Sequence, residues 1–221
     1  MKIIISSLLT ISTIFYFSSL EDFFQRIGIS WTLSKSLPYL FLIALGLFIA
    51  LLFTKKAVTK NMKRILFLLI LPLPFIIGFA FHPIYEGDFS KNGIQLTPLD
   101  YQENTIKDGL IVITIPNCPY CYESISKIKK LALRNPKLQI EYVVCSSDTN
   151  DILTYQAEID GLFDIHLAKD KNKLAKIADL SFPAFVQVKN NKQIYKWSNS
   201  QFGVRAMDVI EDCISNSLKN N

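Results

Sequence analysis

The chain has 221 residues, of which 50% are hydrophobic, and a formal net charge of +5 at pH 7. Residues 1–86 carry 8 of the 24 basic and 3 of the 19 acidic residues, which leaves 16 of each in 87–221. The whole positive charge therefore belongs to the N-terminal part. Because basic and acidic residues are equal in number in the C-terminal part, it offers no basic patch large enough to bind many phosphates. This argues against a nucleic-acid partner.

Three apolar runs occupy the N-terminal part: Ile3–Leu20, Leu37–Phe53 and Ile65–Phe81. Each is close to the shortest length at which a helix crosses a bilayer, so the sequence predicts a membrane region of about three spans over residues 1–81. Two prolines, at positions 72 and 74, predict a kink in the third span. A cleaved signal peptide over residues 1–20 is the alternative reading of the first run.

The loop between the second and third runs is basic and contains no acid; its charges are Lys55, Lys56, Lys60, Lys63 and Arg64. The positive-inside rule makes such a loop cytoplasmic, so residues 82–221 are expected on the extracytoplasmic side, at the inner membrane of a bacterium. No cysteine precedes Cys118, so these spans cannot relay electrons through thiols. We therefore expect a membrane anchor or docking surface and a separate membrane electron-transfer partner.

A linker over 82–94 is predicted to precede a domain over 95–221. The run 110–115 is rich in β-branched residues, which is typical of a central strand buried on both faces. Pro116 and Asn117 end the strand. An amphipathic helix follows, with apolar positions at Ile125, Ile128, Leu131 and Leu133.

The sequence Cys118-Pro119-Tyr120-Cys121 lies between this strand and this helix. Unpaired amides and the dipole at a helix N-terminus stabilise negative charge, which predicts a lowered pKa for the Cys118 thiol. Cys118 is therefore the expected nucleophile and Cys121 the more buried resolving thiol. Pro119 suits the first helical turn.

Two other readings of this motif are a structural disulfide and half of a zinc site. Zinc requires a second ligand pair, and the remaining candidates are isolated: Cys145, Cys213, His82 and His166. A structural disulfide across two residues closes a very small loop and stabilises little. The sequence thus favours redox chemistry without a metal or another cofactor.

Ser181-Phe182-Pro183 precedes a predicted strand, a turn at 189–192 and another strand. With the Cys-x-x-Cys motif sixty residues earlier, residues 95–218 resemble the thioredoxin-like superfamily. The segment 165–185 is similar to extracytoplasmic, membrane-associated thioredoxins of the TlpA and ResA type. The resemblance implies a cis-proline loop in which Pro183 faces the motif and the Phe182 backbone binds substrate; Pro183 as simple strand-start punctuation is the alternative.

One position departs from that family. Many of its members carry a buried acid six residues before the first cysteine, where this chain has Val112. The resemblance implies that such an acid moves the proton of the buried cysteine. Here this step is left to water, to Glu123 or to the partner.

The other two cysteines are open to more than one reading. Cys145 ends a predicted strand over 138–145 and Cys213 falls in a predicted helix over 203–218, where each can be a small packing residue. An even cysteine count outside the cytoplasm also permits a disulfide between them. Tyr120 is expected to contact substrate.

These features predict an α/β protein with a thioredoxin-like fold, a central mixed sheet flanked by helices, after an α-helical membrane segment. The expected function is a protein-disulfide oxidoreductase that exchanges disulfides with protein thiol substrates, with a slight lean to the reductase direction. A disulfide oxidase or isomerase is one alternative. The other is a non-catalytic membrane binding or assembly protein with the same fold.

Overall fold

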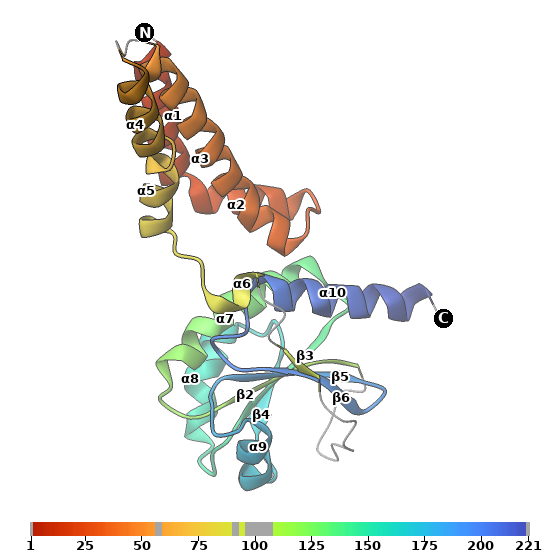
Figure 1. Ribbon diagram of the computed structural model, residues 1–221. Coiled ribbons are helices and arrows are strands. Elements are labelled where there is room, and N and C mark those ends of the chain that lie inside the picture. Colours follow the sequence, from red (N-terminus) through yellow and green to blue (C-terminus); the bar gives the residue numbers. More distant parts are fainter. Residues whose placement is uncertain (1, 56–58, 90–92, 96–107, 220–221) are drawn as a thin grey trace. The chain divides into compact units, whose positions relative to one another are not determined.

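The computed structural model describes residues 2–55, 59–89, 93–95 and 108–219 (Figure 1). It divides the chain into two compact units, residues 1–85 and 86–221. We call the first the helical unit and the second the sheet unit.

The helical unit is built from apolar helices. Their bounds are α1 (Lys2–Phe15), α2 (Phe17–Arg26), α3 (Trp31–Thr54), α4 (Lys60–Ile70) and α5 (Leu73–Phe81). In the described residues, two helical stretches are long and apolar enough to cross a membrane: Trp31–Thr54, with 24 residues, and Lys60–Phe81, with 22. In an apolar 18-residue window of the second stretch, only 11% is buried within the protein. So much exposed apolar surface is typical of a segment covered by lipid or by a partner.

The first predicted span differs from the structure. The run from Ile3 to Leu20 is not one helix, because α1 ends at Phe15 and α2 begins at Phe17 after a break at Tyr16. The apolar part of α1, Ile5–Phe15, is shorter than the other two stretches. Its sequence contains no proline or glycine to signal the break.

Contacts from α3 and from the end of α5 surround this break. The His82 ring lies 3.0 Å from the Ile14 carbonyl through Nε2 and stacks on Phe17 at 4.4 Å between ring centroids. The Tyr39 hydroxyl of α3 donates to the His82 carbonyl. Residues distant in sequence thus fix the place where α1 ends.

The third predicted span is interrupted as expected near its prolines. Helix α4 ends at Ile70 and α5 begins at Leu73, with Pro72 before it. At this interruption Gly46 of α3 comes so close that an added Cβ would lie 2.2 Å from the Leu71 carbonyl oxygen. Glycine is therefore required where α3 passes the break.

The sheet unit alternates strands and helices in its described part. Its elements are α6 (Glu86–Phe89), β1 (Ile94–Gln95), β2 (Gly109–Thr114), α7 (Pro119–Arg134), β3 (Gln139–Val144), α8 (Asn150–Ile159), β4 (Asp164–Leu167), α9 (Lys171–Ile177), β5 (Ala184–Lys189), β6 (Lys192–Trp197) and α10 (Val204–Lys219). Helix α6 and the start of β1 fall within the segment 82–94 that the sequence predicts to be a linker.

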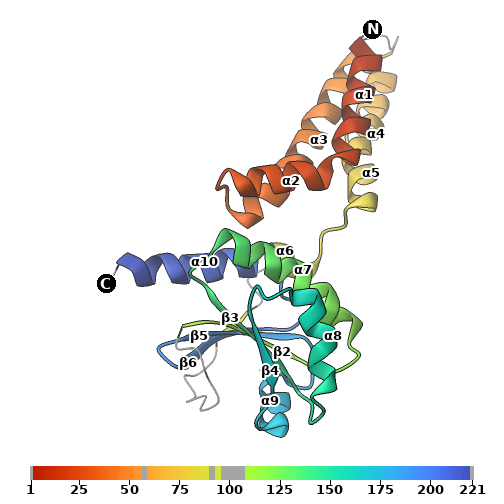
Figure 2. The same cartoon turned by 180° about the vertical axis from the view of Figure 1, so that it is seen from behind.

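The strands form one mixed sheet in the order β1-β6-β5-β2-β3-β4. The pairs β2–β3 and β3–β4 are parallel, whereas β2–β5, β5–β6 and β1–β6 are antiparallel. Helices α7 and α10 cover one face and α9 covers the other (Figures 1 and 2). The α/β class and the mixed sheet flanked by helices are therefore confirmed.

All six residues of β2 are buried, which confirms the central strand expected from its β-branched composition. On one face Ile111 and Ile113 pack with Val143, Val186 and Leu174 of α9. Parallel pairing aligns the ends of β2 and β3, since Thr114 lies opposite Val144. The loops that follow these two strands therefore leave the sheet at the same edge.

Candidate active site

The Cys-x-x-Cys motif lies where β2 ends and α7 begins. Thr114 is the last residue of β2, Cys118 is the N-cap of α7 and Pro119 is its first helical residue. Pro119 is tolerated there because the first amides of a helix have no carbonyl partner within it. Asn117 has a left-handed backbone, with φ of 54°, and so turns the chain into the helix.

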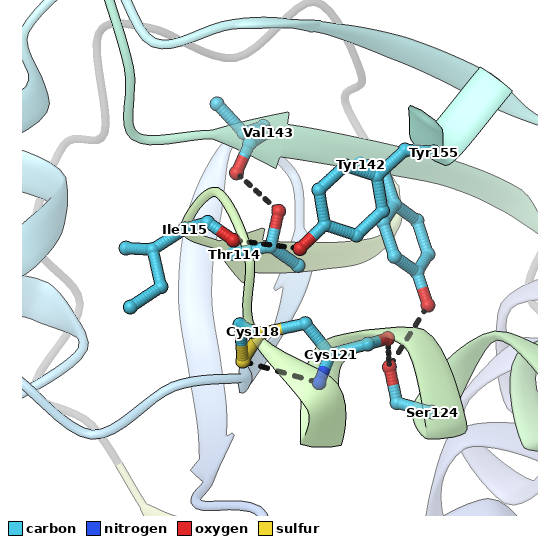
Figure 3. The surroundings of a disulfide bond; sticks show 8 residues. All are labelled: Thr114, Ile115, Cys118, Cys121, Ser124, Tyr142, Val143 and Tyr155. Carbon is cyan, nitrogen blue, oxygen red and sulfur yellow. Dashed lines mark hydrogen bonds between the residues drawn. A yellow bond between two sulfur atoms is a disulfide. The ribbon is translucent and has the colours of Figure 1, made fainter. Parts of the chain in front are cut away.

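Cys118 and Cys121 form a disulfide, with their Cα atoms 5.2 Å apart (Figure 3). Cys118 retains 7% of its surface exposed and Cys121 none, so the first cysteine is the accessible one, as predicted. The backbone N–H of Cys121 points at the Cys118 sulfur, with a nitrogen–sulfur distance of 3.2 Å. A thiolate on Cys118 would accept that same hydrogen bond.

Pro183 lies at the same sheet edge as the motif. Strand β5 begins at Ala184, which pairs with Ile113 near the end of the antiparallel β2. The residue before Ala184 is therefore beside the chain that leads into the motif. Pro183 is buried, and its peptide bond with Phe182 is cis, as the resemblance implies.

The other predicted substrate-contact residues differ in exposure. Tyr120, inside the motif, is 59% exposed, which leaves its ring available to a partner. Phe182 is half-buried and packs against the cluster of Ile111, Ile113 and α9, together with Cys145. Its side chain is thus partly committed to the core.

Three polar residues beneath the motif were not singled out from the sequence. Ser124 Oγ donates to the Cys121 carbonyl at 2.7 Å, and the Tyr142 hydroxyl lies 3.1 Å from the same Oγ. The Tyr155 hydroxyl donates to the Ile115 carbonyl at 2.6 Å. Figure 3 shows these groups around the disulfide. Only the pairing of β3 with β2 and the packing of α8 bring them together, so no local pattern could reveal them.

Burial sets the protonation state of both tyrosines. Desolvation raises the pKa of Tyr142 well above its ordinary value of 10.0. Desolvation also raises the pKa of Tyr155, with a further contribution from neighbouring Tyr122, whose ring stacks on it at 4.5 Å. Both phenols therefore stay protonated at neutral pH and act as hydrogen-bond donors, not as bases.

The position of the family's buried acid is occupied by apolar packing. Val112 is fully buried and pairs in register with Tyr142 on β3. Neighbours in register on parallel strands project to the same face of the sheet, so the Tyr142 side chain lies beside Val112. Glu123, which the sequence offers as one alternative to that acid, is exposed on α7.

Cys145 and Cys213 are not joined by a disulfide in the structure. Cys145 directly follows β3, and its N–H donates to the Thr114 carbonyl, so it lies at the same sheet edge as the motif. Cys213 lines a hollow with Gly109, the first residue of β2, at the opposite edge. The two thiols are therefore at opposite ends of the sheet. Burial raises the pKa of Cys213.

Comparison with known proteins found two similar solved structures. A secreted Mycobacterium tuberculosis disulfide oxidoreductase homologous to E. coli DsbE is 14% identical, with a TM-score of 0.39 over 47% of this chain and 79% of that one. A thioredoxin-like protein from Bacteroides caccae is 10% identical, with a TM-score of 0.35 over 80% of this chain and 81% of that one. No protein-family model and no curated protein matches the chain.

Proposed function

We propose that the chain is a membrane-anchored thiol–disulfide oxidoreductase with a thioredoxin-like sheet unit, acting on extracytoplasmic protein substrates. The observation that carries this proposal is the Cys118–Cys121 disulfide at the N-terminus of α7, in which Cys118 is 7% exposed and Cys121 is fully buried. Pro183, which directly precedes β5 at the same sheet edge, supports it. No metal or other cofactor is needed for this exchange.

The chemistry is two successive exchanges. In the reductase direction, Cys118 thiolate attacks a substrate disulfide, forms a mixed disulfide and releases one substrate sulfur as a thiolate. Cys121 thiolate then attacks Cys118 Sγ, which breaks the mixed disulfide, releases the second substrate thiolate and closes the Cys118–Cys121 bond. The two electrons gained by the substrate come from the protein dithiol, and the departing thiolates take up the protons. In the oxidase direction the same steps run backward.

The helix N-terminus supports the first of these steps. The positive end of the α7 dipole and the Cys121 N–H, 3.2 Å from the Cys118 sulfur, both stabilise a thiolate at position 118. Tyr120, exposed beside it, and the backbone of Phe182 are proposed to contact the substrate peptide. Pro183 is proposed to face the disulfide and to hold that backbone in place.

The helical unit is proposed to cross the membrane through Trp31–Thr54 and Lys60–Phe81, with α1 as a third and shorter span, and to hold the sheet unit outside the cytoplasm. Because the sequence has no cysteine before Cys118, electrons must pass to the motif from a separate membrane or extracytoplasmic partner. The expected location is the inner membrane of a bacterium.

Activity is tested with the full chain in detergent micelles by the dithiothreitol-driven reduction of insulin. The wild type should accelerate insulin reduction, and Cys118→Ser should reduce the rate to the uncatalysed level, because it removes the nucleophile. Cys213→Ser is the matched control and should retain the wild-type rate. Equal rates for Cys118→Ser and the wild type would leave the non-catalytic binding or assembly alternative as the better account.

The direction is decided by the reduction potential of the Cys118–Cys121 pair in a glutathione redox buffer. We favour the reductase direction, which requires a value near that of thioredoxin, about −270 mV. A value near that of DsbA, about −120 mV, would assign the protein as an oxidase instead. Cys121→Ala, which cannot resolve mixed disulfides, should trap both substrate and electron partner on Cys118 for identification.

A further inference from the structure

The two buried tyrosines bond to opposite sides of the disulfide turn. The Tyr155 hydroxyl holds the carbonyl of Ile115, three residues before Cys118. On the other side, Ser124 Oγ donates its only proton to the Cys121 carbonyl, so the hydroxyl hydrogen between Ser124 and Tyr142 must come from the tyrosine. The chain of donors therefore runs from Tyr142 to Ser124 to the backbone of Cys121.

This chain is buried and rigidly placed. Tyr142 is completely buried and Ser124 is 2% exposed, so water does not compete for either hydroxyl. The Tyr142 ring is stacked on Phe163, with ring centroids 5.1 Å apart. Its backbone is fixed in register with Val112 on β2. The hydroxyl is therefore held at the end of a side chain that has little freedom to move.

Resting on the proposed function, we propose that Tyr142 and Ser124 are positioning residues that keep Cys121 within reach of Cys118 while the disulfide is open. In the oxidised protein the sulfur–sulfur bond itself holds the turn. In the reduced protein and in the mixed disulfide that bond is absent, and the Tyr142–Ser124–Cys121 chain holds the second cysteine in place instead.

The consequence is a higher effective concentration of Cys121 at the Cys118 sulfur. Holding two reacting groups in place accelerates their reaction and favours its product. The attack of Cys121 thiolate on Cys118 Sγ should therefore be faster, and the closed disulfide more stable, than in a turn without this support. Loss of the Tyr142 hydroxyl lets the opened turn relax and so stabilises the dithiol relative to the disulfide.

Tyr142→Phe in the full-length protein tests this inference. In a glutathione buffer, the equilibrium constant for closing the Cys118–Cys121 disulfide should fall about tenfold, which corresponds to a reduction potential about 30 mV less negative. The mixed disulfide formed with glutathione should persist about tenfold longer, because it is resolved by the same attack. Tyr122→Phe is the matched control: its ring belongs to the same group of stacked aromatic side chains, and its hydroxyl bonds Thr154, which lies outside the motif.

A purely structural role predicts a different result. It would lower the stability of the oxidised and reduced proteins equally and leave the potential unchanged. An equilibrium constant within twofold of the wild type for both Tyr142→Phe and Ser124→Ala would overturn the inference. Ser124→Ala removes the same link from the helix side, so it keeps the test available if the tyrosine variant does not fold.

The double variant Tyr142→Phe/Ser124→Ala adds a further check. In Ser124→Ala the buried Tyr142 hydroxyl loses its partner; adding Tyr142→Phe removes that hydroxyl, so the double variant should regain thermal stability relative to Ser124→Ala, while the shift in potential should remain. The potential is measured by glutathione titration alone. A wild type that is inactive on protein substrates would therefore refute the proposed function without deciding the role of Tyr142.

Discussion

The two cysteines of the motif differ in their surroundings by more than their order in the sequence. Cys118 keeps 7% of its surface exposed and has the Cys121 N–H beside its sulfur, whereas Cys121 is completely enclosed. Cys118 is therefore the more accessible of the two cysteines. The sequence predicts this division of roles, because the position of Pro119 fixes which cysteine precedes the helix.

The tyrosines beneath the motif were beyond prediction, since their contacts depend on strand register and on a helix about 30 residues away.

The burial of Tyr142 and Tyr155 has a consequence at high pH. In the folded protein desolvation raises the pKa of Tyr142 and of Tyr155, whereas in the unfolded chain both titrate near their ordinary value of 10.0. Above about pH 10 the unfolded chain loses protons that the folded protein keeps. Stability is therefore fully present below about pH 10 and is lost as pH rises further.

The free energy of unfolding of the full chain in micelles, measured in urea from pH 9 to 12, should fall by up to about 1.4 kcal/mol per pH unit for each tyrosine. Tyr155→Phe should make the fall of the unfolding free energy with pH shallower by the contribution of one tyrosine. This change in slope is separate from any loss of stability at neutral pH that comes from removing the hydrogen bond to the Ile115 carbonyl. An unchanged slope in Tyr155→Phe would contradict this assignment.

At the scale of elements, α7 supports the motif through one apolar face. Ile125, Ile128 and Leu131 are buried against the sheet, as their spacing predicts. Leu133, which the sequence also assigns to that face, is 67% exposed. The fourth apolar position therefore lies outside the face, because a residue two positions beyond Leu131 points away from it.

These two leucines form a matched pair for measuring how much the helix depends on its buried face. Leu131→Ala should destabilise the protein by about 2–5 kcal/mol, because it leaves a cavity beneath α7. Leu133→Ala should change stability by less than about 0.5 kcal/mol, since its side chain already contacts solvent. Urea denaturation of both variants, each in the oxidised state, measures the difference. Similar losses for the two would mean that α7 packs differently.

At the scale of the whole molecule, the sequence predicts element types better than it predicts interruptions. The strands around the motif were placed within one or two residues, because buried β-branched runs bounded by prolines are distinctive. The break at Tyr16 was missed, because the run from Ile3 to Leu20 has uniform composition. What marks the break are contacts with His82 and Tyr39, which depend on tertiary structure.

The break leaves α1 with 14 residues, a length of about 21 Å, which is less than the roughly 30 Å of a bilayer core. The extracytoplasmic side proposed for the sheet unit does not depend on α1. It follows from the two longer stretches, Trp31–Thr54 and Lys60–Phe81, and from the basic loop between them. If that loop is cytoplasmic, the chain leaves α5 on the outer side whether or not α1 crosses.

Single cysteines in a background with all four native cysteines replaced by serine test this orientation. In bacterial spheroplasts, a membrane-impermeant maleimide should label Tyr85→Cys, after α5, and should label Thr59→Cys, in the basic loop, only after the membrane is permeabilised. Lys2→Cys should behave like Thr59→Cys, because α1 begins at the same end of the helical unit as α4 (Figure 1). Labelling of Lys2→Cys in intact spheroplasts would reduce the number of spans to two while leaving the sheet unit outside. Labelling of Thr59→Cys there would invert the topology, and the proposed extracytoplasmic substrates would have to be abandoned.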